Sequence, residues 1–165
     1  QLIDLYQLPD DARILDIGCG KAFLLYEFKR LLPNCQVTGL DISEHALRTA
    51  KEEVRPNLMR HDAKKPLPFA DQAFDLAISI TTLHNLAIPE LKTALQEMER
   101  VAKAKYLLVE SFRDEQELFN LQCWALTCES FLRPETWTWL LEEFGYTGDY
   151  EFIYFEGASA AAAKA

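Results

Sequence analysis

The sequence predicts an α/β fold: an open, mostly parallel twisted sheet with helices on both faces, in three layers. Short apolar runs alternate with segments of helical periodicity along the chain, which is the pattern of a parallel sheet. The run FDLAISI at 74–80 is apolar at nearly every position, as expected of a strand buried on both faces. A chain of 165 residues suits one core, so we expect a single domain over 1–156.

Three strands and two helices are expected in the first half of the chain. The strands are RILDI (13–17), QVTGLD (36–41) and LMRHD (58–62). Helical periodicity covers 22–32. The apolar residues expected to share one face of that helix are Phe23, Leu24, Phe28, Leu31 and Leu32. A second helix is expected over 44–54, because Ser43 can cap its first turn.

The second half begins with a loop at 64–73 that holds two prolines. Three further strands are expected, at 74–80, 106–112 and 149–156. Pro89 favours the start of a helix that runs to about Lys103, and 114–132 is helical and rich in aromatic residues. Pro134 opens a last helix, which Gly145 stops. The final nine residues, 157–165, are rich in alanine and lack an amphipathic pattern, so we expect a linker there.

Charge and composition argue against several classes of partner. The net charge is −9, and a protein that wraps nucleic acid needs a basic face, so no nucleic-acid partner is expected. No run of 18 apolar residues is present, so no membrane span is expected. The four cysteines form no CxxC pair, which favours reduced thiols in a cytoplasmic protein and no metal site. We expect a monomer or a homodimer.

Residues 14–22 read ILDIGCGKA and place two glycines between the first strand and the first helix. In open α/β sheets, ligands bind outside the carboxyl ends of the strands. A dinucleotide fingerprint needs a third glycine where Phe23 stands, and we expect that ring to hold the helix away from the strand. A P-loop needs Ser or Thr after its lysine, and Lys21 is followed by Ala22. Both phosphate-binding motifs are therefore disfavoured.

Three carboxylates lie where the first three predicted strands end. Asp16 precedes Gly18 by two residues, Asp41 ends the second strand, and Asp62 ends the third. Three acids around one crevice would repel a pyrophosphate. They would suit a ligand with a cationic end, a ribose diol and an exocyclic amine, and S-adenosylmethionine carries all three. Taken singly, each acid could equally cap a helix or make a turn.

Several motifs occur in the order and at the spacings that are typical of one protein family. ILDIGCG, then GLDIS, then RHDAKKPLPFADQAFDLAISITTLHNL follow one another at the expected spacings. With these motifs the chain resembles the class I S-adenosylmethionine-dependent methyltransferases of the small-molecule, methyltransferase-domain type. The likeness is good over about 10–112 and looser beyond. It implies a Rossmann-like fold, a methyl-transfer activity and S-adenosyl-L-methionine as cofactor, with S-adenosyl-L-homocysteine as product.

The resemblance implies roles for residues of the glycine turn. Gly18, Cys19 and Gly20 would pass under the methionine part of the cofactor. Asp16 would hold its ammonium group through water. The third glycine common in the family is replaced by Ala22, which is also small.

Other implied contacts come from the ends of the second and third strands. Asp41 would accept hydrogen bonds from both ribose hydroxyls, and Ile42 would lie along the adenine. Asp62 would accept from the adenine amine, while the backbone N–H of Ala63 would donate to a ring nitrogen.

The ends of the fourth and fifth strands are expected to serve the reaction itself. Ser79 and Ile80 would line the methionine side of the cofactor. His84 is the first candidate for a general base, and a histidine that packs the following helix is the competing interpretation. Glu110 is the second candidate; it could bind an acceptor amine or hydroxyl, or be a solvated strand end.

An aromatic stretch follows the fifth strand, where the family builds its substrate wall. Trp124, Phe131, Trp137 and Trp139 could face a planar or sugar-like acceptor, although packing on the sheet is expected for most of them.

The predicted function is methyl transfer to a small-molecule acceptor by in-line displacement. The alternative is a catalytically incomplete domain that binds S-adenosylmethionine or serves as a scaffold. Residues 1–8 read as the last turns of a lid helix, and the chain ends in one predicted strand where the family has an antiparallel pair; both departures favour that alternative. An NAD-dependent oxidoreductase is disfavoured by Phe23 and by the lack of a Tyr-x-x-x-Lys pair.

Overall fold

The computed structural model describes residues 1–156 and contains one six-stranded sheet in the order β3-β2-β1-β4-β5-β6. Every neighbouring pair of strands is parallel. The strands are β1 (Arg13–Ile17), β2 (Gln36–Asp41), β3 (Leu58–Arg60), β4 (Phe74–Ile80), β5 (Ala102–Glu110) and β6 (Asp149–Ile153). This order confirms the open α/β sheet, and it reverses between β1 and β4, which is the switch point where such folds bind ligands.

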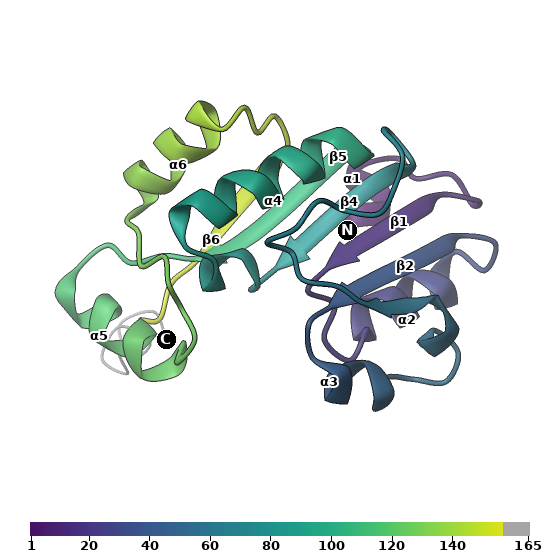
Figure 1. The fold of residues 1–165 in the computed structure, drawn as a ribbon, viewed down its shortest axis with the longest axis horizontal. Helices are drawn as coiled ribbons and strands as arrows, with labels where there is room; N and C mark the ends of the chain where they lie inside the picture. Colours follow the sequence, from purple (N-terminus) through teal and green to yellow (C-terminus); the bar gives the residue numbers. More distant parts are fainter. Residues whose placement is uncertain (157–165) are drawn as a thin grey trace, which may run out of the picture.

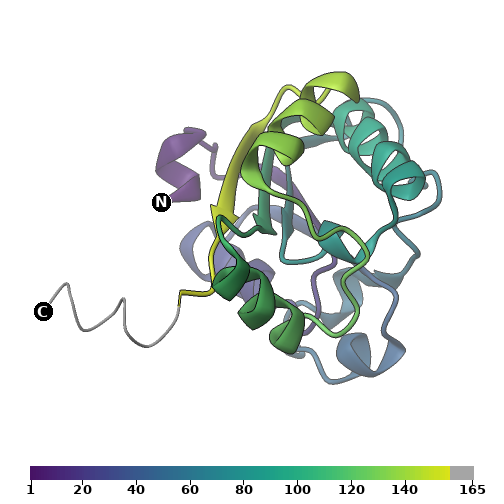
Figure 2. The ribbon, with the colours of Figure 1, turned by 90° about the vertical axis from the view of Figure 1, so that its left-hand side faces the viewer.

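Helices cover both faces of the sheet, giving the expected three layers (Figure 1). The helices are α1 (Leu2–Leu5), α2 (Phe23–Leu31), α3 (Glu44–Arg48), α4 (Ile88–Val101), α5 (Glu115–Trp124) and α6 (Pro134–Glu143). Figure 2 shows α4 and α6 side by side on one face, with α1 and α2 on the other. No described helix is long and apolar enough to cross a membrane.

Side chains on the two faces of β1 pack into two separate apolar cores. Leu15 and Ile17 pack with Leu91 and Leu95 of α4, whereas Ile14 packs with Leu25 and Phe28 of α2. This division follows from the strand period of two, which sends successive side chains to opposite faces. Each fully buried Leu, Ile or Phe contributes about 1.5–3 kcal/mol to folding.

The predicted face of α2 is wrong at two positions. Phe23 and Leu31 are 62% and 56% exposed, while Leu25 and Phe28 are buried. Phe23 therefore does not hold the helix away from β1, because its ring points to solvent. The fully buried Ala22 is the residue that packs beneath the turn, so the small residue needed here lies at position 22.

Some element boundaries also differ from expectation. The helix predicted over 44–54 ends at Arg48, where the Thr49 hydroxyl donates to the carbonyls of His45 and Ala46. Such local side-chain bonds compete with helix propagation. Ser43 caps this helix by accepting from Ala46 N at 3.2 Å, as predicted. The fifth strand begins at Ala102, inside the stretch expected to be helical.

The last strand, β6, ends at Ile153 rather than at residue 156. It pairs in parallel with β5, with Tyr106 opposite Asp149 and Glu110 opposite Ile153. It is therefore the edge strand of the described sheet. The tail predicted over 157–165 lies outside the described residues.

Candidate active site

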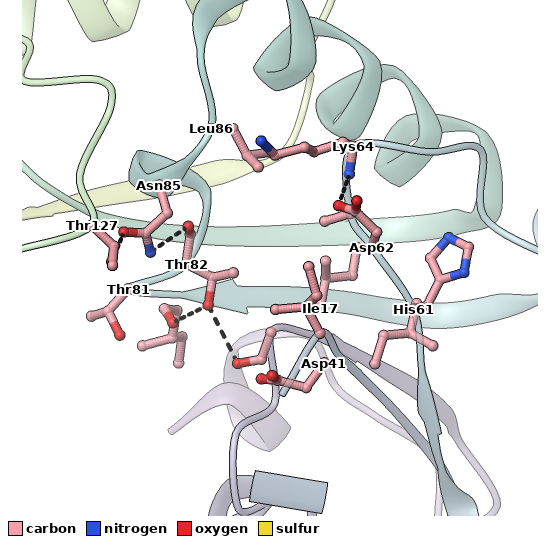
Figure 3. Close-up of a pocket in the computed structure, with 15 residues that line it drawn as sticks. Ile17, Asp41, His61, Asp62, Lys64, Thr81, Thr82, Asn85, Leu86 and Thr127 are labelled. Carbon is pink, nitrogen blue, oxygen red and sulfur yellow. Dashed lines mark hydrogen bonds between the residues drawn. The ribbon is translucent and has the colours of Figure 1, made fainter. Parts of the chain in front are cut away.

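A pocket of about 470 Å³ lies at the carboxyl ends of the strands, beside the switch point (Figure 3). It falls within the range typical of small-molecule sites. The predicted residues that line it are Gly18, Asp41, Ile42, Asp62, Ala63 and Ile80. Asp16, Cys19, Gly20, Ser79, His84 and Glu110 were also predicted as site residues but do not line it.

The glycine turn is held against the end of β2. The backbone N–H groups of Gly18 and Cys19 both donate to the carbonyl of Leu40, at 2.7 and 2.9 Å. Gly18 has a φ of 82°, and a Cβ there would fall 2.1 Å from Thr82 Oγ1, so two constraints require glycine. Gly20 and Ala22 also have positive φ, 53° and 56°. The family's preference for a third glycine thus corresponds to a left-handed backbone that alanine adopts here.

Asp41 connects the glycine turn to the helix that follows β2. Its Oδ2 accepts from the backbone N–H of Gly20 at 2.8 Å, and its Oδ1 accepts from Ser43 N at 2.7 Å. Each carboxylate oxygen can accept one further bond. Asp41 is therefore fixed in place while it lines the pocket, with acceptor capacity left for hydroxyl groups.

Asp16 lies buried behind the glycine turn. Burial, and then the charge of Asp41, raise the pKa of Asp16 to about 7. No hydrogen bond from the described residues to the Asp16 carboxylate offsets these two effects. A buried acid without a donor is costly when charged, and a nearby cation would relieve that cost.

The far wall of the pocket is formed by the loop after β3. Asp62 Oδ1 accepts from Lys64 N at 3.1 Å, which fixes the turn. The Lys64 ammonium lies 3.0 Å from Glu90 on α4 and so ties this loop to that helix. His61 also lines the pocket, and its Nε2 is buried without a hydrogen-bond partner among the described residues.

Ser79 and Ile80 lie at the end of β4 but differ in orientation. Ile80 lines the pocket. The Ser79 hydroxyl is fully buried and donates to the carbonyl of Ile17 at 2.9 Å. Ser79 therefore fastens β4 to β1, and the structure does not bring it to the pocket.

The polar pocket residues that were not predicted include Lys64, Thr81, Thr82, Asn85 and Thr127. Asn85 lies between Thr82 and Thr127 in Figure 3: its amide donates to Thr82 O at 3.0 Å, and its Oδ1 accepts from the Thr127 hydroxyl at 2.7 Å. Thr81 and Thr82 follow β4 directly, so their place at the carboxyl end of a strand could have identified them as site residues. Thr127 comes from the loop after α5, and nothing in its sequence context marked it.

His84 and Glu110 lie in contact with each other, although they are far apart in sequence. His84 belongs to a short 3-10 helix, η2 (Leu83–Asn85), just past β4, and Glu110 ends β5. Both side chains are buried, and the imidazole Nδ1 faces Glu110 Oε2. The sequence placed both at strand ends but did not show that they would form a pair.

The aromatic stretch divides into core and surface. Trp137 is fully buried in the core beside α4, whereas Trp124 and Trp139 are 54% and 57% exposed. Phe131 is half-buried in a small cluster with Leu121 of α5. Trp124 stacks near Phe155 at a ring distance of 4.8 Å, and its ring centre lies 6.5 Å from that of His84. Trp124 is therefore the member of this group that lies near a predicted catalytic residue.

A parallel sheet with this strand order, a glycine turn after β1, acids at the ends of β1 and β2 and an acid just beyond β3 define a class I S-adenosylmethionine-dependent methyltransferase domain. A family model described as "Methyltransferase domain" matches residues 8–145, and the chain belongs to that family.

Among curated relatives, the chain is 31% identical over 149 residues to a 2-phytyl-1,4-naphtoquinone methyltransferase of Nostoc sp., covering 84% of this chain and 61% of that protein. It is 38% identical over 104 residues to a demethylmenaquinone methyltransferase of Desulfitobacterium hafniense, covering 58% and 40%. A tRNA (carboxymethyluridine(34)-5-O)-methyltransferase of Arabidopsis thaliana is 34% identical over 115 residues, covering 68% and 27%. The chain thus spans less than two thirds of the length of each of these relatives.

Solved structures share the fold. A SAM-dependent methyltransferase from Aquifex aeolicus superposes with a TM-score of 0.59 at 23% identity, covering 87% of this chain and 77% of that one. The YcgJ protein of Bacillus subtilis superposes with a TM-score of 0.67 at 20% identity, covering 87% and 65%.

Proposed function

We propose that this protein transfers a methyl group from S-adenosylmethionine to a small-molecule acceptor by in-line displacement. The observation that carries the proposal is the pair of acids behind and beside the glycine turn. Asp16 is buried with no hydrogen-bond donor among the described residues, and Asp41 lines the pocket next to it. Such an arrangement favours a ligand that is cationic at one end and carries hydroxyl groups at the other.

The other predicted contacts fit the same cofactor. Asp41 keeps acceptor capacity for the two ribose hydroxyls, and Ile42, Asp62 and Ala63 lie along the wall where the adenine would be held. Gly18 lets the turn pass directly against Thr82, since a Cβ there would lie 2.1 Å from Thr82 Oγ1, and the methionine part would pass along this turn. When bound, S-adenosylmethionine supplies a methyl group already activated by a positive sulfonium. The protein's own task is then to align the acceptor and exclude water.

A small molecule is the acceptor that the charge balance favours. Two of the relatives described above are named as quinone methyltransferases, and one is named as a tRNA methyltransferase. A net charge of −9 disfavours a phosphate backbone as ligand, because each phosphate contact needs a basic partner. The exposed Trp124 beside η2 offers an apolar surface for a planar acceptor.

Isothermal calorimetry with S-adenosylmethionine and with S-adenosylhomocysteine tests the cofactor site. Transfer of labelled methyl to a panel of small acceptors, including 1,4-dihydroxynaphthalene, tests the activity. We expect binding of both compounds and turnover of at least one acceptor. Absence of binding would overturn the proposal. Binding without turnover of any acceptor would support the alternative of a scaffold domain.

A further inference from the structure

The buried contact between His84 and Glu110 is not explained by the cofactor pocket. Both residues lie at the carboxyl ends of neighbouring strands, and neither lines the pocket. Their neighbours in sequence, Thr82, Asn85 and Leu86, do line it. The pair therefore lies directly behind the pocket wall, on the β4–β5 side.

The Glu110 carboxylate accepts no hydrogen bond that would give it a structural role. It is 1% exposed, and apart from the His84 contact no hydrogen-bond donor of the described chain reaches either of its oxygens. Trp137 donates its indole N–H to the backbone carbonyl of Glu110, not to the side chain. Burying a carboxylate with so few donors is costly, so a purely structural role for it is disfavoured.

The backbone around His84 is held firmly. Its carbonyl accepts from the N–H groups of Glu129 and Ser130, both at 3.0 Å, and the Ser130 hydroxyl donates to Leu86 O at 2.6 Å. These bonds place the loop after α5 over η2. With Nδ1 facing Glu110, Nε2 is the ring nitrogen left for a ligand.

One other titratable group faces the pair from this loop. Burial, and then the charges of Glu110 and Glu129, raise the pKa of the Cys128 thiol to about 11, against a hydrogen bond from the Ser130 backbone that lowers it. The thiol therefore stays protonated near neutral pH. Cys128 is therefore disfavoured as a base here, whereas the free ring nitrogen of His84 has the chemistry to accept a proton.

We propose that His84 is the proton acceptor of the methyl transfer, that Glu110 is the residue that positions its ring, and that the acceptor is an aromatic hydroxyl. This inference rests on the proposed function. The acceptor O–H bond breaks, its proton passes to His84 Nε2 and its electron pair stays on oxygen. That oxygen bonds to the methyl carbon while the carbon–sulfur electron pair stays on sulfur. Glu110 accepts a hydrogen bond from Nδ1–H throughout and balances the charge of the imidazolium.

The choice of an aromatic hydroxyl follows from proton affinities. A phenol has a pKa of about 10, within reach of an imidazole base, whereas an ordinary alcohol holds its proton far more tightly. The exposed ring of Trp124, 6.5 Å from the His84 ring and stacked near Phe155, provides a flat apolar surface beside the base.

The first test needs no acceptor. Protein labelled with ¹⁵N-histidine is compared with its Glu110→Gln variant by NMR, and the other two of its three histidines, His45 and His61, serve as internal references. We expect Nδ1–H in the parent and a change toward Nε2–H in Glu110→Gln. Glu117→Gln is the matched control, because this buried carboxylate contacts Arg113 instead of His84. An unchanged His84 tautomer in Glu110→Gln would overturn the positioning role.

The second test uses 1,4-dihydroxynaphthalene as the acceptor. We expect His84→Gln to lower kcat by about 100-fold and to abolish the rise of rate with pH, the size expected of a lost general base. Glu110→Gln should lower kcat with little change in KM, and His45→Gln, on exposed α3, should change neither. Calorimetry on each variant separates the two proposals, since cofactor binding should be unaffected. Failure of the parent to bind cofactor would defeat the proposed function. Normal binding with an unchanged kcat in His84→Gln, or with no transfer to this acceptor by the parent, would defeat this inference alone.

Discussion

Gly18 and Thr82 approach so closely that a Cβ on Gly18 would lie 2.1 Å from Thr82 Oγ1 and 2.2 Å from Thr82 Cγ2. The contact joins the turn after β1 to the segment after β4, across the switch point of the sheet. This close contact is a stronger reason for glycine at the floor of the pocket than the positive φ alone.

We predict that Gly18→Ala destabilises the fold more than Gly20→Ala does. Both residues have positive φ, which costs alanine about 1–2 kcal/mol, but a Cβ at Gly20 would meet nothing within 4 Å. The overlap at Gly18 should add about 1–3 kcal/mol to that cost. Urea unfolding of the two variants measures the difference. Adding Thr82→Ala, which removes two of the three overlapping atoms, should recover part of the loss; equal stability of the two glycine variants would contradict the prediction.

Asp41→Ala should weaken S-adenosylmethionine binding by about 1–3 kcal/mol, since a charge-assisted hydrogen bond to the ribose would be lost. The variant also removes the bonds to Gly20 N and Ser43 N, so its unfolding free energy must be measured alongside. Asp11→Ala, an exposed carboxylate away from the pocket, is the control. Calorimetry that gave the same affinity for Asp41→Ala and the parent would remove Asp41 from the site.

Asp16 should make the unliganded protein less stable as pH rises. Its pKa is raised from the ordinary value of 3.8 to about 7 by folding, so between pH 4 and 7 the folded state keeps a proton that the unfolded chain releases. Raising the pH through this window should lower the free energy of unfolding by up to about 4 kcal/mol. Asp16→Asn should lack this decline and be the more stable protein at pH 8. Parallel pH profiles for the two proteins would refute the assignment.

Asp75 provides an internal contrast to that pH dependence. Partial burial raises its pKa, but hydrogen bonds from Arg13 and Lys103 outweigh that effect and hold the pKa well below the ordinary value. Its contribution to stability is present above about pH 4 and is lost as pH falls further. The two carboxylates therefore act in separate pH windows.

Trp137 and Trp139 should differ sharply although they lie close together on α6. Trp137 is fully buried and donates to Glu110 O at 3.2 Å, so Trp137→Ala should cost about 3–5 kcal/mol. Trp139 is largely exposed, and Trp139→Ala should cost less than about 0.5 kcal/mol. Thermal unfolding compares them. A similar loss in both variants would mean that α6 packs differently from the structure described above.

The sequence was sufficient to predict the sheet because its central strands, β1, β4 and β5, contain buried apolar runs separated by segments of helical periodicity. Local patterns also placed Asp16 and Asp41 correctly at the ends of β1 and β2, whereas β3 ends at Arg60, two residues before Asp62. They could not show that Asp41 uses both oxygens to hold the glycine turn, or that the Ser79 hydroxyl faces Ile17, since those bonds depend on side-chain orientation.

Contacts between segments far apart in the sequence could not be predicted from local patterns either. The pairing of His84 with Glu110 and of Asn85 with Thr127 depends on how β4, β5 and the loop after α5 come together. Periodicity reports which residues share a face of one element. It carries no information on which elements meet, so the exposed position of Phe23 was also missed.

The reversal of strand order between β1 and β4 has a consequence for how this protein could change. The acids proposed to recognise the cofactor all precede Lys64, and the pair proposed to move the proton follows Ile80, so the two tasks fall on opposite sides of the switch point. The Gly18–Thr82 contact and the shared pocket wall join the two sides. Substitutions away from that junction should leave the other side largely intact, so a new acceptor preference could be selected by recombining the later segments alone.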